Sequence, residues 1–382
     1  MNAPIKLRKL EVKEHKKTRA LWESVFSEDT KAFLDYYYRR KTADNQIYVV
    51  EEQKKIISML QLNPYSLRIQ STRVRGNYII AVATEAQYRS RGMMRALLIQ
   101  AMKDMYRAKE PFTFLMPAAE AIYTPYDFRF VYDQDQSYVR GVPAAECTRC
   151  KVKEASLEDT KKMAAFAMRY LKETCQVYAY RDEDYYLTMM LEQRAENGGV
   201  KLVWDGRRLV GMFAYAKEEA WEIREPIFQK EYENYFAYAV YALTRDTDTA
   251  VKCLAYRSSE LTADTEKHPM IMVRILYLKK LFSAMRVKSG EQLSCSFAVL
   301  DPILHENSRI WHLSGDEKGN VIVGESEDSQ GALTIGALTS LLFGYKQVGE
   351  IAQEENVLLT EELMQQLKKI QPLEKIFLNE IV

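Results

Sequence analysis

A short pattern that occurs twice constrains the fold of this chain more than any other feature. Residues 47–50 (Ile-Tyr-Val-Val) precede a polar turn and then residues 56–59 (Ile-Ile-Ser-Met). Residues 200–203 (Val-Lys-Leu-Val) precede Asp-Gly-Arg and then residues 209–212 (Leu-Val-Gly-Met). One shift of 153 residues superposes both pairs, since 47 moves to 200 and 56 moves to 209. Each copy is typical of a β-hairpin, and the shared shift favours a duplicated fold over coincidence.

Helices and strands are expected to alternate around both hairpins. Before the first hairpin we predict helices over 16–26 and 30–40, and after it a strand over 71–84, a helix over 92–107 and a strand over 112–116. The helix rests on apolar residues that recur every three or four positions. A helix-rich stretch, 157–194, likewise precedes the second hairpin. This order predicts an α/β layer architecture.

The last part of the chain has a different character. A dense apolar run covers 268–285 and leads to three expected strands, over 291–300, 308–313 and 320–323. Two expected helices follow, over 335–343 and 360–369. We interpret this part as a third, smaller α+β domain. A chain of 382 residues is long enough for two or three domains.

Composition and charge exclude several classes of function. Lys plus Arg number 54 and Asp plus Glu 53, so the net charge is +1 and there is no general basic field for nucleic acid. No apolar run is long enough for a membrane span, and the first 14 residues lack the apolar stretch of a signal peptide. We therefore expect a cytoplasmic protein that binds neither nucleic acid nor membrane.

Cysteines and histidines predict no metal centre. Cys147 and Cys150 have C-x-x-C spacing, but no second pair or nearby histidine completes a zinc site. The five cysteines are too few and too scattered for a disulfide framework. The four histidines lie far apart, at 15, 268, 305 and 312. We interpret the thiol pair as inert and the histidines as structural or surface residues.

The stretch from Val82 to Arg95 carries most of the chemical information. A strand ends there, a basic loop follows, and a helix begins at Gly92. The first N–H groups of a helix have no partner within the helix and lie at the positive end of its dipole, which makes an anion site. Glycine lets a phosphate approach the backbone, and Arg89, Arg91 and Arg95 add charge that suits phosphate. A solvated basic helix start is the alternative interpretation.

The run Arg89-Ser90-Arg91-Gly92-Met93-Met94 resembles the pyrophosphate-binding loop of the GNAT superfamily of N-acetyltransferases, Arg/Gln-x-x-Gly-x-Gly/Ala. The last small residue is replaced by methionine here. The longer stretch is similar to the loop of the "enhanced intracellular survival" (Eis) branch, V-A-V-x-P-x-x-R-R-R-G-L-L-R. The resemblance implies acetyl-CoA as cofactor, bound by Val82, Ala83, Thr84, Arg89, Ser90, Arg91, Gly92, Met93, Met94 and Arg95.

A second stretch, residues 115–128, supports the same branch. Tyr123 occupies the place of the tyrosine that is the general acid in Eis-type enzymes, and Asp127 stands where the family usually has glycine. A core tyrosine is the alternative in a chain with 25 tyrosines. The resemblance further implies that the C-terminal carboxylate, here that of Val382, is the catalytic base, with Glu380 as a substitute. The aromatic residues of 22–38 would form the acceptor wall, although most suit the core faces of amphipathic helices.

The resemblance also implies an organisation for the whole chain. Eis-type proteins look like a catalytic GNAT domain, a degenerate second GNAT-like domain and a domain similar to sterol carrier proteins. We expect these domains at 1–145, 146–270 and 271–382, with mixed central sheets flanked by helices in the first two. No Arg-x-x-Gly loop occurs near 235–250, so the second copy is not expected to bind acetyl-CoA. A homo-oligomer, a hexamer by resemblance, is also implied.

The sequence thus predicts acetyl transfer from acetyl-CoA to a primary amine, such as an aminoglycoside-like polyamine, a small amine or a lysine side chain. The amine must lose a proton before it attacks, and backbone N–H groups near Val82–Thr84 would polarise the thioester carbonyl. Two other functions remain open, a non-catalytic acetyl-CoA sensor and a lipid carrier acting through the third domain.

Overall fold

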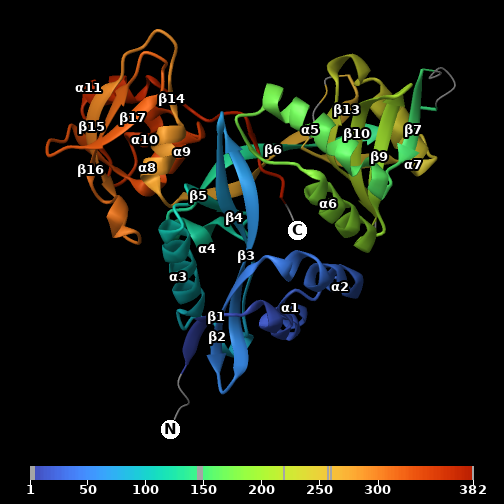
Figure 1. Ribbon diagram of the computed structural model, residues 1–382, viewed down its shortest axis with the longest axis horizontal. Helices are drawn as coiled ribbons and strands as arrows, with labels where there is room; N and C mark the ends of the chain where they lie inside the picture. The colour runs from blue at the N-terminus through green and yellow to red at the C-terminus, as the bar shows by residue number, and fades with distance from the viewer. Residues whose placement is uncertain (1–4, 144–148, 218–219, 256–257, 259, 381–382) are drawn as a thin grey trace.

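The computed structural model describes residues 5–143, 149–217, 220–255, 258 and 260–380. Figure 1 shows three lobes. The first domain forms the centre and base, the second domain forms one upper lobe, and the C-terminal domain forms the other. The predicted α/β class with a C-terminal α+β domain is confirmed.

The first domain has the predicted elements. Its strands are β1 (Lys6–Lys9), β2 (Gln46–Glu52), β3 (Lys55–Ile69), β4 (Thr72–Thr84), β5 (Phe112–Leu115) and β6 (Arg129–Arg140). Its helices are α1 (Arg19–Val25), α2 (Lys31–Arg39), α3 (Met93–Arg107) and α4 (Glu120–Tyr123). Helices α1 and α2 cover one face of the sheet, and α3 covers the other. Of the apolar positions of α3 predicted to share one face, Leu98, Ala101 and Met105 are buried and Met94 is partly buried.

The second domain repeats this order. Its strands are β7 (Cys150–Glu154), β8 (Val177–Ala179), β9 (Gly199–Asp205), β10 (Arg208–Lys217), β11 (Trp221–Phe228), β12 (Ala250–Leu254) and β13 (Thr262–Ile275). Its helices are α5 (Thr160–Thr174), α6 (Glu183–Ala195) and α7 (Tyr235–Thr244). The hairpin β9–β10 pairs Asp205 with Arg208, and β2–β3 pairs Glu52 with Lys55. Both pairs differ by 153 positions, so the repeat in the sequence is a repeat of the fold.

The two copies share one 14-stranded sheet because they exchange their last strands. Strand β13 of the second copy lies between β5 and β6 of the first, and β6 of the first copy pairs with β12 of the second. Buried residues of β13 such as Met272 therefore complete the core of the first domain. The predicted boundary at residue 271 falls inside this strand, so we propose that the third domain begins after it.

The third domain is built on the sheet β17-β16-β15-β18-β19. Its strands are β14 (Arg286–Val287), β15 (Ser294–Leu300), β16 (Ile310–Gly315), β17 (Val321–Glu325), β18 (Gly331–Thr334), β19 (Leu358–Leu359) and β20 (Ile370–Gln371), and its helices are α8 (Leu278–Ala284), α9 (Ile335–Leu342), α10 (Val348–Ile351) and α11 (Glu361–Leu367). The expected apolar run 268–285 is in fact split between β13 and α8. Helix α9 packs on β6 and β13, which joins this domain to the central sheet.

The C-terminal segment returns from the third domain to the junction of the other two. Strand β21 (Ile376–Phe377) pairs in parallel with β8, and β8 pairs with β3 of the first domain. The described part of the segment, coloured red, lies beside the long β3–β4 hairpin in Figure 1. The segment therefore connects all three domains at one place.

Candidate active site

Strand β4 carries a bulge where it separates from β5. Met59 of β3 pairs with Ala83, but Gln61 pairs with Ile80, which leaves Ala81 and Val82 opposite a single β3 residue. Ala81 has a positive φ of 50°. The parallel pairing with β5 is confined to Tyr78 and Phe114, before the bulge. A bulge leaves backbone groups out of the ladder, so those of Ala81 and Val82 can serve a ligand between β4 and β5.

The basic loop lies where the sequence predicts it. Gly92 is the residue before α3 and has φ 78°, and a Cβ built there would meet nothing within 4 Å. No acidic residue lies in the first turn of α3. Arg89, Arg91 and Arg95 are exposed; Arg89 Nε donates to the Thr84 carbonyl at 3.2 Å, and Arg91 lies over the Tyr88 ring at 5.2 Å. This open, basic helix start fits a pyrophosphate.

The other predicted cofactor residues differ in exposure. Met93 is buried, and Met94 is partly buried against the same core, so both side chains face the protein interior. Ser90 has a positive φ of 61° and is exposed. Thr84 is partly buried, and its hydroxyl lies 2.7 Å from that of Ser58. The side chains of Met93 and Met94 therefore anchor the start of α3, and any contact of these two residues with a ligand would be made by the backbone.

Tyr123 ends the short helix α4 and is 7% exposed. Its ring makes an edge contact with Phe128 at 5.8 Å between ring centroids. Burial raises the pKa of the Tyr123 hydroxyl to about 12, so it carries its proton at neutral pH. Asp127 adopts φ 63°, a left-handed conformation that aspartate tolerates. The turn after Tyr123 thus has the geometry that glycine would favour.

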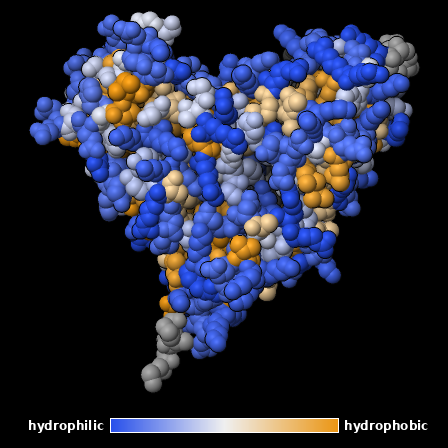
Figure 2. All heavy atoms as spheres, viewed as in Figure 1, coloured by the Kyte–Doolittle hydropathy of each residue, from blue (hydrophilic) through white to orange (hydrophobic). Residues whose placement is uncertain are grey.

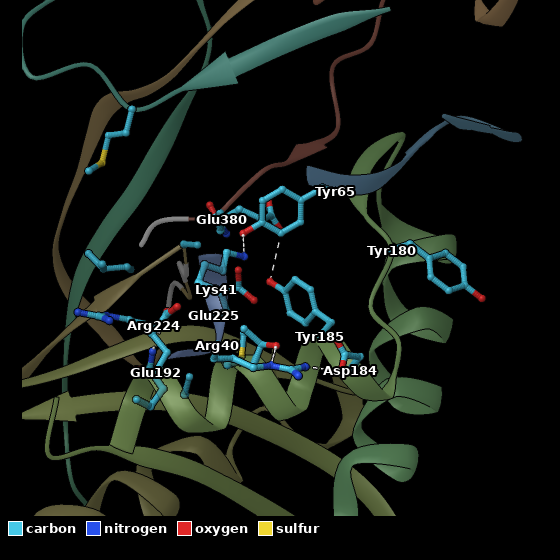
Figure 3. A pocket seen from close by; sticks show the side chains of 18 of the residues that line it. Arg40, Lys41, Tyr65, Tyr180, Asp184, Tyr185, Glu192, Arg224, Glu225 and Glu380 are labelled. Carbon is cyan, nitrogen blue, oxygen red and sulfur yellow. Dashed lines mark hydrogen bonds and ion pairs between the residues drawn. The ribbon is translucent and has the colours of Figure 1, made fainter. Parts of the chain in front are cut away.

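A cavity of about 630 Å³ lies at the junction of the domains. The first domain contributes Lys41, Tyr65 and Met116, and the second domain contributes residues of α6, β11 and β12. Asn379 and Glu380 of the C-terminal segment also line it. Figure 3 shows Lys41, Tyr65, Tyr185 and Glu380 gathered around its centre, whereas Tyr180 points away. The cavity suits a small polar ligand.

A buried ion-pair network fixes the C-terminal segment. Arg181, which is 0% exposed, donates to Glu380 at 2.8 Å and to both oxygens of Glu225 at 2.9 and 3.0 Å. Tyr132 donates to the Asn379 side chain at 2.8 Å and also to the Leu378 carbonyl. Removing one partner of such a buried pair is strongly destabilising, by about 3–5 kcal/mol. The network therefore holds the chain two residues before its end. Val382, the predicted base, lies outside the described residues.

Glu192 of α6 lines the same cavity. It accepts a hydrogen bond from the Tyr36 hydroxyl at 3.0 Å. Burial raises the pKa of its carboxyl to about 7, and Lys41 opposes this shift. A group that titrates near neutrality inside a cavity is a candidate for ligand binding or proton transfer.

The second copy retains the bulge but has lost the loop. Met212 pairs with Ile227 and Ala214 with Arg224, which leaves Glu225 in the bulge with φ 49°. Glu225 thus corresponds to Ala81 of the first copy. Its carboxylate is occupied by Arg181, and α7 is preceded by Asn234 instead of a glycine with flanking arginines. We infer that this copy lends a wall to the shared cavity and does not bind a second cofactor.

The expected acceptor wall is mainly core. Trp22, Phe33 and the tyrosines 36–38 are buried and pack with one another under the sheet, and Glu23 and Asp35 both pair with Arg19. Lys41, Arg181 and Glu192 were not predicted from the sequence as site residues. The local pattern near two of them is the N-cap residue Asp182, which marks the start of α6 but not a site. Within the described residues no group of side chains could hold a metal ion, and no described helix is long and apolar enough to cross a membrane.

Comparison with known proteins agrees with the fold. Residues 6–131 match the acetyltransferase (GNAT) domain, and residues 278–379 match the sterol carrier protein domain. No curated protein matches the sequence significantly. The chain is similar in structure to a probable N-acyltransferase from Enterococcus faecalis, with TM-score 0.82 and 16% identity over 98% of this chain and 100% of that one.

Two further solved structures have the same fold. A GCN5-related N-acetyltransferase from Anabaena variabilis has TM-score 0.82 and 15% identity, over 98% of this chain and 99% of that one. Eis1 from Mycobacterium abscessus has TM-score 0.72 and 14% identity, over 98% and 99%. The likeness to the Eis branch is therefore a distant one.

The first domain is thus an acetyltransferase (GNAT) domain, and the third is a sterol carrier protein domain. The enzyme class that follows is N-acetyltransferase. The chain joins the two domains through a second copy of the acetyltransferase fold, and the three parts meet at the 630 Å³ cavity.

Proposed function

We propose that the protein transfers an acetyl group from acetyl-CoA to a primary amine that enters the cavity between the first two domains. The observation that carries this proposal is the position of the C-terminal segment. It reaches the cavity wall at Asn379 and Glu380, where Met116, at the end of β5, also lies. The end of β5, the cavity and the C-terminal segment up to Glu380 thus lie together.

The residues that fit acetyl-CoA are those of the basic loop and the β4 bulge. Backbone N–H groups at the start of α3, with Arg89, Arg91 and Arg95, would hold the pyrophosphate. Gly92 leaves open space for it. When bound, acetyl-CoA supplies the activated acetyl thioester. The backbone N–H groups of Val82–Thr84 would donate hydrogen bonds to its carbonyl oxygen.

Proton movements are assigned to two groups. Tyr123, protonated at neutral pH, donates the proton that the departing sulfur needs. The terminal carboxylate of Val382 accepts the proton of the amine nitrogen, directly or through water. Glu380 suits this role less well, because its carboxylate is already engaged in a buried ion pair with Arg181 at 2.8 Å.

Thiol release from acetyl-CoA with a panel of aminoglycosides, polyamines, amino acids and lysine peptides tests the proposal. Tyr123→Phe should lower kcat by about 100-fold, the usual effect of losing a positioned proton donor, with little change in acetyl-CoA affinity. Tyr126→Phe, a partly buried neighbour, is the matched control. Normal turnover by Tyr123→Phe would refute the assignment. Binding of acetyl-CoA without thiol release for any amine would instead indicate a sensor. The homo-oligomer stays a prediction from the resemblance.

A further inference from the structure

The charges in the cavity are not all paired. Arg40 pairs with Asp184, and Arg224 pairs with Glu196 and Glu222. Lys41 has no carboxylate within ion-pair distance among the described residues; its ammonium donates to the Tyr65 hydroxyl at 2.8 Å and lies 4.4 Å from the centre of the Tyr65 ring. Figure 3 shows this contact in the middle of the cavity, beside Glu380. A cation at the centre of an acidic cavity is unfavourable for a ligand that carries only positive charge.

Lys41 is partly buried, which makes its unpaired charge costly. The pKa of Lys41 is lowered because burial disfavours its charge, and the nearby carboxylates of Glu192, Asp44 and Glu380 do not fully offset that effect. A buried charge is normally paired or bound. A ligand anion at Lys41 would supply the missing partner, and the Tyr65 hydroxyl, which accepts from Lys41, can donate to the same anion.

A second hollow continues from this point. It has a volume of about 550 Å³ and shares Asp44, Pro64, Tyr65 and Ser66 with the main cavity. Its other lining residues include Arg73, Arg75 and Lys280. The path from the main cavity to this hollow is therefore basic beyond Tyr65. Figure 2 shows that the visible face of the molecule is mostly hydrophilic.

We propose that the acceptor is an amine that also carries a carboxylate, an amino acid or a peptide, and that Lys41 with Tyr65 binds this carboxylate while the acidic groups of the cavity face the amine. Glu192, which lines the cavity from α6, is the acidic group best suited to bind the amine. In the described part of the chain, no cation lies within ion-pair distance of its carboxylate, which accepts a hydrogen bond from Tyr36. This inference rests on the proposed function for the transfer step. The carboxylate site itself stands on the position of Lys41.

Matched pairs of amines test it. We would compare 6-aminohexanoate with pentylamine, and lysine with cadaverine, as acceptors at saturating acetyl-CoA. The dipeptide Lys-Gly and its amide distinguish a peptide from a free amino acid. The carboxylated member of each pair should have a kcat/KM at least about tenfold higher, as expected for a charge-assisted hydrogen bond. Lys41→Met should reduce that ratio toward 1, Lys41→Arg should largely retain it, and Lys31→Met, at an exposed lysine of α2, should leave it unchanged.

A binding measurement separates this inference from the proposed function. 6-Aminohexanoate alone should raise the melting temperature of the wild type more than pentylamine does, and Lys41→Met should abolish the difference. If that result holds while no amine is acetylated, the carboxylate site stands and the transferase proposal fails. If amines are acetylated equally well with and without a carboxylate, or if diamines are preferred, the carboxylate site is wrong and the transferase proposal stands.

Discussion

At the scale of single residues, the conformation of Gly92 is the feature that sequence and structure describe alike. Its φ of 78° and the open space around it allow a negative charge to be placed at the start of α3 without a clash. Gly92→Asp and Gly92→Asn differ only in that charge, and both residues tolerate a left-handed conformation.

Acetyl-CoA should stabilise the wild type by about 2.7 kcal/mol at 100 times its Kd. Gly92→Asp should abolish the rise in melting temperature because its carboxylate repels the pyrophosphate, whereas Gly92→Asn should keep most of it. The measurement is a thermal melt with and without acetyl-CoA. An undiminished rise in Gly92→Asp would place the cofactor elsewhere.

Glu192 predicts a specific pH dependence of stability. Burial raises the pKa of its carboxyl from 4.5 to about 7, so between these values the folded state binds a proton that the unfolded state has lost. The contribution of this group to stability is full below pH 4.5 and is lost as the pH rises to about 7. Glu192→Gln lacks this titrating group, so its free energy of unfolding should fall less from pH 5 to pH 8 than that of the wild type. The expected difference is about 1–2 kcal/mol, a value that allows for water in the cavity.

Urea unfolding at pH 5 and pH 8 measures this difference. Glu183→Gln, at an exposed glutamate of the same helix, is the control and should follow the wild type. Equal pH dependence in Glu192→Gln and wild type would mean that Glu192 is well solvated in the folded protein.

The position of the basic loop could be predicted from sequence because it depends on neighbours in the chain. Arg89 and Gly92 are three positions apart and lie at one helix start. Arg181 and Glu380, by contrast, are separated by 199 positions. Lys41 has no local signal either, since its proposed role depends on the cavity around it, where no described carboxylate lies within ion-pair distance. The roles of such residues depend on tertiary contacts, which a single sequence does not reveal.

At the scale of elements, the repeated hairpins could be predicted, but the strand exchange could not. Neither β6 nor β13 was among the strands expected from the sequence, and the residues of a strand do not by themselves indicate which edge of a sheet it joins. The exchange has a consequence for folding, because the antiparallel partner strand of β5 is β13 from the second copy. Residues 271–273 of β13 are fully buried in the core of the first domain.

A chain that ends at residue 145 should accordingly fail to fold cooperatively. It retains every strand of the first copy but exposes the β5 edge and the apolar core under it. Co-expression with a second chain that starts at residue 146 should restore a folded complex. Circular dichroism melts and size-exclusion chromatography measure both results. A monomeric 1–145 fragment with a sharp unfolding transition would show that the exchange is dispensable for the fold of the first domain.

At the scale of the whole molecule, the third domain leads into the segment that reaches the cavity at Asn379 and Glu380. It packs on β6 and β13 through α9, and a buried ion pair between Arg274 and Asp301 at 2.6 Å joins it to the central sheet. The chain then leaves it through β21 toward Glu380. Sequence alone predicted the three domains by resemblance, but the path of the last residues depends on how the domains dock.

The last prediction concerns that chain end. Arg181 and Tyr132 fix Glu380 and Asn379, and the proposed base, the terminal carboxylate of Val382, follows two residues later in the sequence. Two glycines added after Val382 would displace the carboxylate by up to about 7 Å, at 3.3–3.6 Å per residue. Acetyl transfer should fall by about 100-fold, the usual contribution of a general base, while the melting temperature and its rise with acetyl-CoA should stay near the wild-type values. Two glycines added before Met1, at the other end of the same chain, are the matched control and should leave turnover unchanged. An extended protein that works as well as the wild type would exclude the terminal carboxylate and return the base to a side chain of the cavity, with Glu192 the first to test.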